Sequence, residues 1–401
     1  MNTKQIKVMV VAGTRPEAIK IAPVVKKLLN RPDKFQTIIV ATAQHRELLD
    51  QAFSLFHIKP DIDLNLMNNK QGLSELTSRV LESMSATLRE VKPDIIIVQG
   101  DTTTVFAAAL AAFYQKIPVA HIEAGLRSYN NYSPFPEEMN RHLTTVLTDI
   151  HFAPTLSARQ SLLNEGIDDD KIVITGNTVV DSLMYISSLP FSFEHSELEN
   201  LDFHRYRLLL VTSHRRESWG IELHNICEAI KELVQRHPDV MVIYPVHPNP
   251  IVKTTAAQIL AGLDRVHLIN PLDYMTFVNL MKRSFMILTD SGGVQEEAPT
   301  LKKPLLLLRK VTERPEAFKA GLAKIIGTNK KRIIQESERL LNDPGLYQEM
   351  IDSYNPYGDG KAADRIVNAL IRWTKGESPL LTPFEEFDPY ALKENLLCQR
   401  Q

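Results

Sequence analysis

The sequence predicts an α/β protein built from two doubly wound, Rossmann-like parallel sheets, one in each half of the chain. Short apolar runs recur that are continuous rather than alternating, and amphipathic segments with helical spacing lie between them. Continuous apolar runs are typical of strands covered on both faces, and alternating strands and helices give parallel sheets with right-handed crossovers. Twelve such runs are too many for one ordinary open sheet, so we expect two sets of six strands.

Each expected strand is a short apolar run followed by a polar or turn-forming residue. In the first half these runs are Lys7–Ala12, Thr37–Thr42, Ile95–Gln99, Val119–Glu123, His151–Ala153 and Ile172–Thr175. In the second half they are Leu208–Thr212, Met241–Pro245, Val266–Ile269, Phe285–Thr289, Leu305–Leu308 and Lys324–Ile326. The expected helices show apolar residues that repeat every three or four positions. A helix over residues 226–234 places Ile226, Ile230 and Leu233 on one face, in phase with Cys227, which we therefore expect in a core.

Two breaks interrupt this pattern. The first lies between Gly176 and Arg207, where a helix over residues 179–188 leads into a polar segment. The second is the turn cluster Asn-Pro-Tyr-Gly-Asp-Gly at residues 355–360, after which a last helix is expected over Ala362–Thr374. Residues 377–401 form a tail to which the sequence assigns no role.

The composition disfavours several classes of protein. The 401 residues include 46 Lys and Arg against 48 Asp and Glu, and this net charge of -2 argues against a nucleic-acid binder, which usually has a basic excess. No apolar run approaches the ~18 residues that a membrane-spanning helix needs. The N-terminal segment is typical of a strand rather than a signal peptide, and two cysteines cannot build a disulfide scaffold. We therefore expect a cytoplasmic protein.

Neither a cofactor nor a metal is expected. The turn after the first strand is not a Gly-x-Gly-x-x-Gly fingerprint, so NAD and FAD are not indicated. His214 and His247 lack a third ligand at a motif spacing, which makes a zinc site the weaker hypothesis.

The polar residues after the strands carry the functional signal, because open parallel sheets bind ligands at the carboxyl ends of their strands. In the first half these segments are Gly13–Lys20, Gly100–Thr104, His121–Arg127 and Pro134–Arg141. Each alone also has a structural explanation, such as a helix cap at Asp101 or acids suited to a first helical turn. A strand through Glu123 would turn His121 and Glu123 to one face, with Arg127 as a candidate partner for the carboxylate.

The second half has sharper signals. His214-Arg215-Arg216 follows an apolar strand and has the composition of an anion clamp. Asp290-Ser291-Gly292-Gly293 opens a helix, where backbone N–H groups can approach a phosphate. Glu297, one turn later, has two oxygens suited to a ribose diol. The two halves together predict one crevice that binds a nucleotide.

At these residues the chain resembles the non-hydrolysing UDP-N-acetylglucosamine 2-epimerases. The matching segments run in order along almost the whole chain: Gly13–Lys20, residues 42–46, Gly100–Thr104, His121–Arg127, Ser133–Arg141, residues 176–178, His214–Glu217, Asp290–Pro299, Glu313–Glu316 and Asn355–Gly360. The resemblance implies a glycosyltransferase-B-like pair of Rossmann domains that face a central cleft, and a homodimer. It also implies that the last helix crosses back, so that residues 1–177 and 362–376 form one domain and residues 178–361 form the UDP-binding domain.

The family's reaction interconverts UDP-N-acetylglucosamine (UDP-GlcNAc) and UDP-N-acetylmannosamine (UDP-ManNAc), which supplies ManNAc for cell-surface polysaccharides. UDP is eliminated to leave 2-acetamidoglucal and is then added back with the opposite configuration at carbon 2. The resemblance places the catalytic groups at Asp101, Glu123, Glu137 and His214. It places the contacts to UDP at Arg15, Lys20, Phe277, Ser291, Gly292, Gly293, Glu297 and Arg314. A second UDP-GlcNAc site, acting as an allosteric activator, is implied at Gln44, Glu138, Arg215 and His247.

The sequence departs from some relatives at Glu47 and Lys70, where they carry Gln and Arg. Lys keeps the charge of an Arg but not its bidentate fork, so both positions bear on the strength of activation. Three other functions stay open at this point. They are a glycosyltransferase of the same architecture, a nucleotide-sugar sensor without catalysis, and a hydrolysing epimerase that releases free ManNAc.

Overall fold

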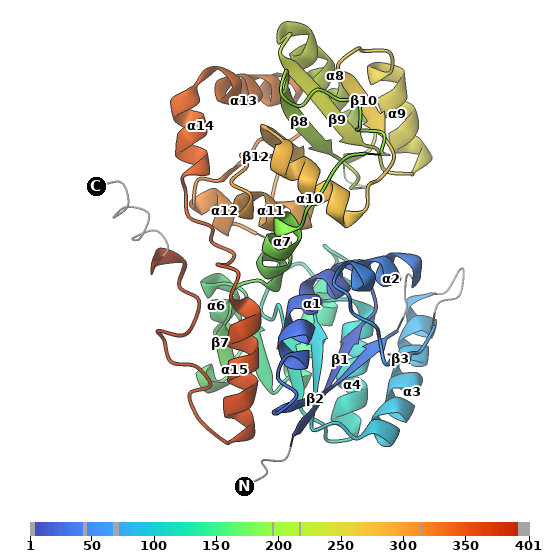
Figure 1. Ribbon diagram of the computed structural model, residues 1–401, viewed down its shortest axis with the longest axis vertical. Helices are drawn as coiled ribbons and strands as arrows, with labels where there is room; N and C mark the ends of the chain where they lie inside the picture. Colours follow the sequence, from blue (N-terminus) through green and yellow to red (C-terminus); the bar gives the residue numbers. More distant parts are fainter. Residues whose placement is uncertain are drawn as a thin grey trace. The chain divides into compact units, whose positions relative to one another are not determined.

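The computed structural model describes residues 5–42, 46–66, 72–194, 196–215, 218–312 and 314–391, with only the backbone at 46–48. The chain divides into two compact units (Figure 1). The N-terminal unit comprises residues 1–182 and 357–388, and the C-terminal unit comprises residues 183–356 and 389–401. Helix α7 (Thr178–Ser188) runs across the division.

The N-terminal unit contains a seven-stranded parallel sheet in the order β3-β2-β1-β4-β5-β6-β7. Its strands are β1 (Ile6–Ala12), β2 (Phe35–Ala41), β3 (Ile62–Asp63), β4 (Ile95–Gln99), β5 (Val119–Ile122), β6 (Ile150–Ala153) and β7 (Ile172–Ile174). The predicted set of six strands is wrong by one, because β3 has only two residues and shows no apolar run. It is held at the edge by pairing of Val40 with Ile62 and of Ala41 with Asp63.

Helices cover both faces of this sheet. They are α1 (Arg15–Leu29), α2 (Arg46–Leu55), α3 (Leu73–Val91), α4 (Thr103–Tyr114), α5 (Glu137–Leu147), α6 (Leu156–Asn164) and α15 (Ala362–Thr374). Met9 and Val11 of β1 pack in one cluster with buried residues of α3 and α4. Helices α1 and α15 lie side by side, as Figure 1 shows. A helix that follows residue 361 in the sequence therefore completes the N-terminal unit.

The C-terminal unit repeats the architecture with a six-stranded parallel sheet in the order β10-β9-β8-β11-β12-β13. Its strands are β8 (Arg207–Thr212), β9 (Val240–Pro245), β10 (Val266–Ile269), β11 (Met286–Thr289), β12 (Leu305–Leu307) and β13 (Ala323–Ile325). Its helices are α8 (Ile221–Arg236), α9 (Pro250–Leu260), α10 (Tyr274–Arg283), α11 (Gly292–Thr300), α12 (Glu316–Lys319), α13 (Lys330–Asn342) and α14 (Pro344–Ile351). The predicted α/β class with two doubly wound sheets is confirmed.

The core of the C-terminal unit confirms the predicted apolar face of the helix over residues 226–234. Ile226, Ile230 and Leu233 of α8 pack with β8 and β9 in one buried cluster. Cys227 lies in the same cluster with no exposed surface, as predicted, and burial raises the pKa of its thiol to about 12. Such a thiol is a small core side chain rather than a nucleophile.

Both sheets reverse their strand order at one point, between β1 and β4 in one unit and between β8 and β11 in the other. At such a point the two connections leave the sheet in opposite directions, which opens a crevice at the carboxyl ends of the strands. The segments that begin at Gly13 and Gly100 follow β1 and β4. Those that begin at His214 and Asp290 follow β8 and β11. The fold therefore places four of the segments singled out in the sequence at the two reversal points.

The tail has a structural role in its first part. The backbone N–H of Phe387 donates to the carbonyl oxygen of Ile174, and the Glu386 carboxylate accepts from the N–H of Ile174 at 3.0 Å. The segment thus occupies the hydrogen-bonding edge of β7, the last strand of the N-terminal sheet. Covering such an edge prevents pairing with other chains. No helix among the described residues combines the length and apolar character needed to cross a membrane.

Candidate active site

The turn after β1 lies close to the residue after β2 and to the first turn of α4. A Cβ atom on Gly13 would lie 2.6 Å from Thr42 Oγ1 and 2.7 Å from Thr104 Oγ1, so no larger residue fits. Thr14 caps α1, and Glu17 accepts hydrogen bonds from the N–H groups of Gly13 and Thr14 at 2.6 and 3.3 Å. Arg15 follows at the first helical position, half-buried. The capping box already bonds the N–H groups of Gly13, Thr14 and Glu17, so Arg15 is the group of this turn that suits an anion.

Glu17 is an acid in an unusual environment. Its side chain is almost completely buried, and burial raises the pKa of this carboxyl to about 7 despite the hydrogen bonds it accepts. Glu17 is the N3 residue of the capping box that begins at Thr14. Because its pKa is raised to about 7, the Glu17 carboxyl changes charge near neutral pH.

The Glu123 carboxylate is held by Lys20 rather than by Arg127. Lys20 Nζ lies 2.8 and 2.6 Å from the two oxygens of Glu123, and Gln99 Nε2 donates to the same carboxylate. The predicted strand geometry is also wrong here. Strand β5 ends at Ile122, and Glu123 has a φ of 68°, so strand alternation does not set the direction of its side chain. Lys20 therefore has a carboxylate partner in addition to its predicted place near UDP.

Arg127 pairs elsewhere, which corrects its expected role. Its Nε and Nη2 atoms donate to the two oxygens of Glu165 at 2.6 and 2.7 Å. Nη2 also donates to Thr145 Oγ1, and Nη1 donates to the Leu126 carbonyl. This bidentate pair fastens the loop after β5 to the end of α6. Arg127 is thus structural.

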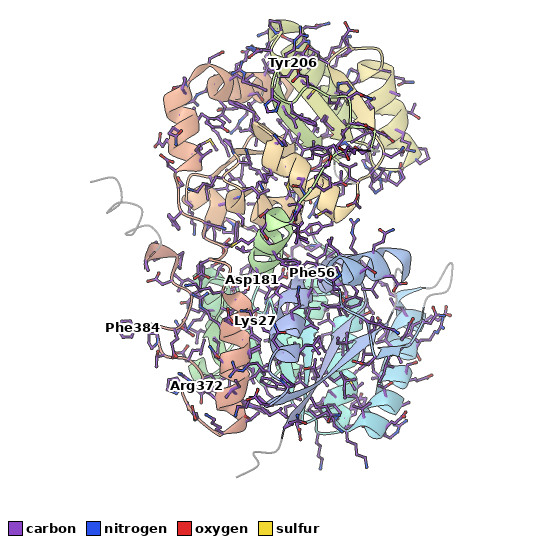
Figure 2. The ribbon with its side chains drawn as sticks, in the orientation of Figure 1. Lys27, Phe56, Asp181, Tyr206, Arg372 and Phe384 are labelled. Carbon is purple, nitrogen blue, oxygen red and sulfur yellow. The ribbon has the colours of Figure 1, made fainter. Side chains whose placement is uncertain are left out.

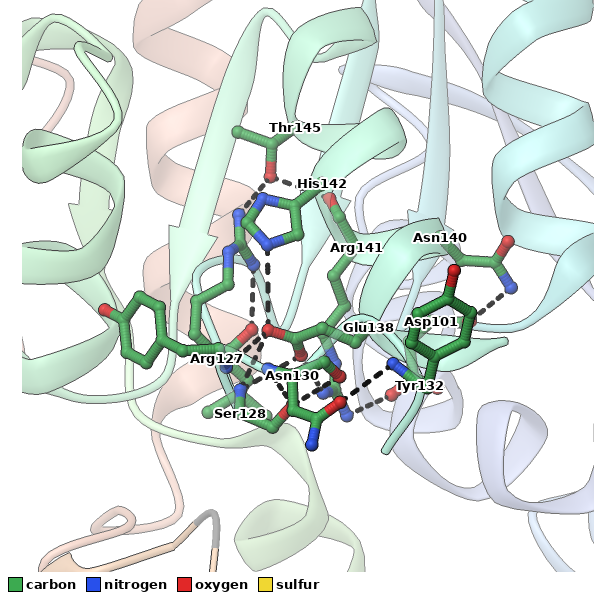
Figure 3. A network of polar contacts seen from close by, with 12 residues as sticks. Asp101, Arg127, Ser128, Asn130, Tyr132, Glu138, Asn140, Arg141, His142 and Thr145 are labelled. Atoms are coloured by element: carbon green, nitrogen blue, oxygen red, sulfur yellow. Dashed lines mark hydrogen bonds and ion pairs between the residues drawn. The ribbon is translucent and has the colours of Figure 1, made fainter. Parts of the chain in front are cut away.

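Asp101 follows β4 and is hydrogen-bonded by two residues of α5. Arg141 Nη2 donates to Asp101 Oδ2 at 2.5 Å, and Asn140 Nδ2 donates to the Asp101 carbonyl oxygen at 2.9 Å (Figure 3). The Asp101 side chain keeps 28% of its surface exposed. Glu137, the first residue of α5, is partly exposed. Asp101 and Glu137 are thus joined through one helix.

Glu138 lies inside this network and does not face solvent. Its carboxylate has no exposed surface and accepts from the N–H groups of Ser128 and Tyr129 and from Arg141 Nη1, at 2.8 to 3.0 Å. Burial alone would raise the pKa of Glu138, but these hydrogen bonds outweigh it and lower the pKa. Glu138 is therefore an ionised anchor for the loop at residues 128–129. As a predicted activator contact it would act through that loop.

His121 fastens the two strand ends that carry the carboxylates. Its Nε2 lies 2.7 Å from the carbonyl oxygen of Gly100, the residue before Asp101. Burial lowers the pKa of His121 to about 4, so the ring is neutral at pH 7 and donates its Nε2–H to that carbonyl. His121 is thus a positioning group for the turn after β4.

In the C-terminal unit, Asp290 organises the loop after β8. This carboxylate is completely buried and accepts from Ser213 Oγ and from the N–H groups of His214 and Arg215, at 2.9 to 3.1 Å. His214 Nδ1 lies 3.3 Å from Asp290 Oδ1. Partial desolvation of the ring lowers the pKa of His214, although the charge of Asp290 opposes the shift. The sequence indicated Asp290 only as part of a phosphate loop.

His247 lies beside His214. The two rings are 5.9 Å apart between centroids and nearly parallel, at 16°. His247 Nδ1 accepts a hydrogen bond from the N–H of Asn249, so its proton is on Nε2. Of the activator residues predicted in this unit, Arg215 and His247 thus lie on the loops that follow the neighbouring strands β8 and β9.

At the start of α11, where a phosphate is expected, Gly293 is exposed and Gly292 is buried. A Cβ atom on Gly293 would meet no atom within 4 Å. Glu297, one turn later, is buried and accepts from Tyr274 Oη at 2.9 Å. Arg314 Nε donates to Glu296 at 2.6 Å, which ties the loop after β12 to α11. Phe277 is partly buried in α10.

The predicted residues fall into two groups. Asp101, Glu123 and Glu137 follow β4 and β5 or begin α5 in the N-terminal unit, together with Arg15 and Lys20. The C-terminal unit carries His214, Arg215, His247, Phe277, Ser291, Gly292, Gly293, Glu297 and Arg314. The side chains of Gln44, Glu47, Lys70 and Glu313 lie outside the described residues.

Sequence reasoning missed Arg141 and Asn140 as partners of Asp101. The only local signal is their spacing, since both lie about one helical turn after Glu137 and so share its face of the helix. Across the part of the chain that the structure describes, no group of three or more His, Cys, Asp or Glu side chains is arranged to hold a metal ion.

The fold and these strand-end groups define an enzyme of the doubly wound α/β class. A family model described as UDP-N-acetylglucosamine 2-epimerase matches residues 27–371. The UDP-N-acetylglucosamine 2-epimerase of Escherichia coli K12 is 50% identical over 370 residues, which covers 91% of this chain and 98% of the relative. This chain belongs to the UDP-N-acetylglucosamine 2-epimerase family, whose members are isomerases.

Solved structures agree with this assignment. The UDP-GlcNAc 2-epimerase of Neisseria meningitidis bound to UDP-GlcNAc superposes with a TM-score of 0.85 at 47% identity, covering 92% of this chain and 100% of that one. The S. aureus MnaA–UDP co-structure superposes with a TM-score of 0.86 at 46% identity, covering 96% and 100%. The predicted family is confirmed.

Proposed function

We propose that this chain interconverts UDP-GlcNAc and UDP-ManNAc by eliminating UDP to leave 2-acetamidoglucal and adding it back. The observation that carries the proposal is the set of carboxylates Asp101, Glu123 and Glu137 at one edge of the N-terminal sheet. The names of the relatives support the substrate, since one of them was solved with UDP-GlcNAc and another with UDP. The elimination route is inferred from the chemistry that follows.

The hydrogen on carbon 2 is not acidic by itself, so its removal must be coupled to departure of the nucleotide. The bond between the anomeric carbon and the diphosphate oxygen breaks, and UDP takes the electron pair. A base removes the carbon 2 proton, and the electrons of that C–H bond form the double bond of the glucal. The return step protonates carbon 2 from the other face while UDP attacks the anomeric carbon. Two groups that exchange protons are therefore required.

Asp101 and Glu137 fit these two roles because both residues keep part of their surface exposed and α5 joins them. Glu123, buried and paired with Lys20, positions the sugar. His214 and Arg15 would stabilise the departing diphosphate. The start of α11 at residues 291–293 would receive the phosphates, Glu297 the ribose, Phe277 the uracil and Arg314 the adjacent phosphate oxygens.

The test is turnover of UDP-GlcNAc alone in deuterated water. Elimination predicts UDP-ManNAc that carries deuterium at carbon 2, and UDP-ManNAc without deuterium would refute it. Turnover with no acceptor present separates this reaction from glycosyl transfer, and product analysis after long incubation separates it from hydrolysis to free ManNAc. In a sensor without catalysis, Asp101→Asn would leave ligand binding and behaviour unchanged.

Activation by a second UDP-GlcNAc molecule belongs to the same proposal. Its support in this chain is the exposed His247 ring beside His214, with Arg215 on the same loop as His214. His247→Ala is expected to abolish the sigmoidal dependence of rate on UDP-GlcNAc while leaving UDP affinity unchanged. A hyperbolic wild-type curve would remove activation from the proposal.

We also propose a homodimer through the outer surface of α4 and α5. Met139, Leu143 and Val146 lie at i, i+4 and i+7 on α5 and are exposed, as are Phe113 and Tyr114 at the end of the neighbouring α4. An isologous dimer would cover this stripe with its own copy. Val146→Glu should convert the dimer mass to a monomer mass in light scattering, whereas Leu29→Glu, exposed on α1, should not. A monomeric wild type would refute the dimer.

The compartment and pathway stay predictions. A cytoplasmic enzyme of this kind would supply ManNAc to cell-surface polysaccharide, and cells without it should lose ManNAc from that polymer.

A further inference from the structure

Arg141 connects two carboxylates that belong to different parts of the N-terminal unit. Its Nη2 donates to Asp101 Oδ2 at 2.5 Å, and its Nη1 donates to Glu138 Oε2 at 2.9 Å. The Arg141 side chain is 5% exposed, whereas that of Asp101 is 28% exposed. The Arg141 guanidinium is therefore buried, whereas the Asp101 side chain that it binds keeps part of its surface exposed.

Asp101 is held at two points by consecutive residues. Asn140 Nδ2 donates to its backbone carbonyl at 2.9 Å while Arg141 binds its carboxylate. Both holders lie on α5, whose first residue is Glu137. Residues three and four positions apart share one face of a helix, about 5 Å along its axis. Helix α5 therefore fixes the distance between Glu137 and the group that grips Asp101.

The Arg141 guanidinium is itself anchored. Glu138 accepts its second N–H group and is bound in turn by the N–H groups of Ser128 and Tyr129. A planar fork that satisfies two carboxylates at once cannot rotate without breaking one of the contacts. A Lys side chain carries the same charge but has no fixed fork, so it cannot hold both carboxylates in this geometry.

We propose that Arg141 is a positioning residue that fixes Asp101 relative to Glu137 for proton exchange on the two faces of carbon 2. The inference rests on the proposed epimerase reaction. That reaction needs two groups at a set separation around one carbon atom. A displacement of about 1 Å in such a group costs roughly 100-fold in rate. In this role Arg141 acts through Asp101, which it binds directly, rather than as a group that exchanges the proton.

The chain offers a matched control in Arg127. Both arginines are buried in the N-terminal unit, and both bind a carboxylate. Both are also bonded to Thr145, because Arg127 Nη2 donates to Thr145 Oγ1 and Thr145 Oγ1 donates to the Arg141 carbonyl oxygen. Arg127, however, pairs with Glu165 and contacts none of the carboxylates proposed for catalysis. Arg141→Lys and Arg127→Lys should therefore lower the thermal midpoint similarly and differ in catalysis.

The experiment compares kcat and KM for UDP-GlcNAc in the wild type and both variants. Arg141→Lys is expected to lower kcat by roughly 10- to 100-fold with KM changed by less than about 3-fold, and Arg127→Lys is expected to leave kcat within about 3-fold. A double-mutant cycle adds a readout that a purely structural role would not move. Because Arg141 acts through Asp101, adding Arg141→Lys to Asp101→Asn should lower kcat no further.

The outcomes are decisive in each direction. Equal kcat values for the two Lys variants, or additive losses in the cycle, would overturn the inference while leaving a working epimerase. A wild type that does not turn over UDP-GlcNAc would refute the proposed function instead. If Arg141→Lys does not fold, Asn140→Ala removes only the contact to the Asp101 carbonyl. A fall in its kcat at constant KM supports the inference, and an unchanged kcat refutes it.

Discussion

The buried Asp290 carboxylate lies 2.9 and 3.1 Å from the backbone nitrogen of His214, across the reversal point of the C-terminal sheet. The same carboxylate accepts from Ser213 Oγ and from the N–H of Arg215. One buried charge at the end of β11 therefore shapes the whole loop after β8. Any anion bound by that loop depends on Asp290, although Asp290 itself is completely buried.

Asp290→Asn tests this dependence. The amide presents an NH₂ group to a set of donors, which leaves buried N–H groups unsatisfied at a cost of about 2 kcal/mol. We expect the thermal midpoint to fall by about 4 to 8 °C and UDP affinity to fall with it. Asp239→Asn is the control, since Asp239 is about half exposed and pairs with Arg207 at the surface. Equal effects in the two variants would contradict the role given to Asp290.

Glu17 predicts a specific dependence of stability on pH. Its pKa is raised from 4.5 to about 7 by burial, so the folded state holds this proton more tightly than the unfolded state does. The free energy of unfolding therefore falls as pH rises from 4.5 to 7, by at most about 3 kcal/mol. Glu17→Gln lacks this proton and should lose the corresponding slope. Urea unfolding at pH 5 and pH 8 measures the difference, and parallel curves for the two proteins would refute the assignment.

The ion pair between Lys20 and Glu123 predicts a loss of stability on removal of Lys20 and a partial recovery when Glu123 is also replaced. Lys20→Met leaves a buried carboxylate without its ammonium, at a cost of about 3 kcal/mol of unfolding free energy. Adding Glu123→Gln should restore most of that stability but not turnover, because Glu123 is proposed to position the sugar. Lys27→Met, on the same helix, breaks an exposed pair with Asp364 and should cost less than about 1 kcal/mol (Figure 2). Recovery of activity in the double variant would remove Glu123 from the site.

The tail predicts a contrast between two phenylalanines. Phe387 is 2% exposed and its ring lies under the Arg365 guanidinium, with Arg365 Cζ 5.6 Å from the ring centroid, whereas Phe384 is fully exposed (Figure 2). Phe387→Ala should lower the unfolding free energy of the N-terminal unit by about 3 kcal/mol, and Phe384→Ala should leave it unchanged. Truncation after Gly376 should also uncover β7 and promote aggregation in light scattering. A stable, monodisperse truncated protein would show that the edge needs no cover.

The sequence was sufficient for most of the fold because periodicity is a local property. Helix α15 was predicted with the bounds it has, and β4 and β10 were predicted residue for residue. Strand β3 was missed because two residues held only by pairing with β2 carry no period of their own. The end of β5 was misjudged because the left-handed backbone at Glu123 is a tertiary requirement.

The candidate site was likewise predictable in part. Its chemical groups could be named from the sequence, because polar residues that directly follow apolar strands must collect at the carboxyl edges of parallel sheets. The partners of those groups could not be named. Glu123 pairs with a residue 103 positions away, Asp101 with one 40 away and Asp290 with one 76 away. Nothing in a local pattern distinguishes Lys20 from Arg127 as the partner of Glu123.

By itself the sequence determined the two doubly wound sheets, the family and the strand-end residues that are proposed to bear the chemistry. Only the tertiary structure decided that Lys20 holds Glu123, that α5 grips Asp101 through Arg141, and that the tail covers β7. The physical reason is that secondary structure follows from spacing along the chain. The pairing of buried charges follows from strand order, which brings together residues that the chain keeps far apart.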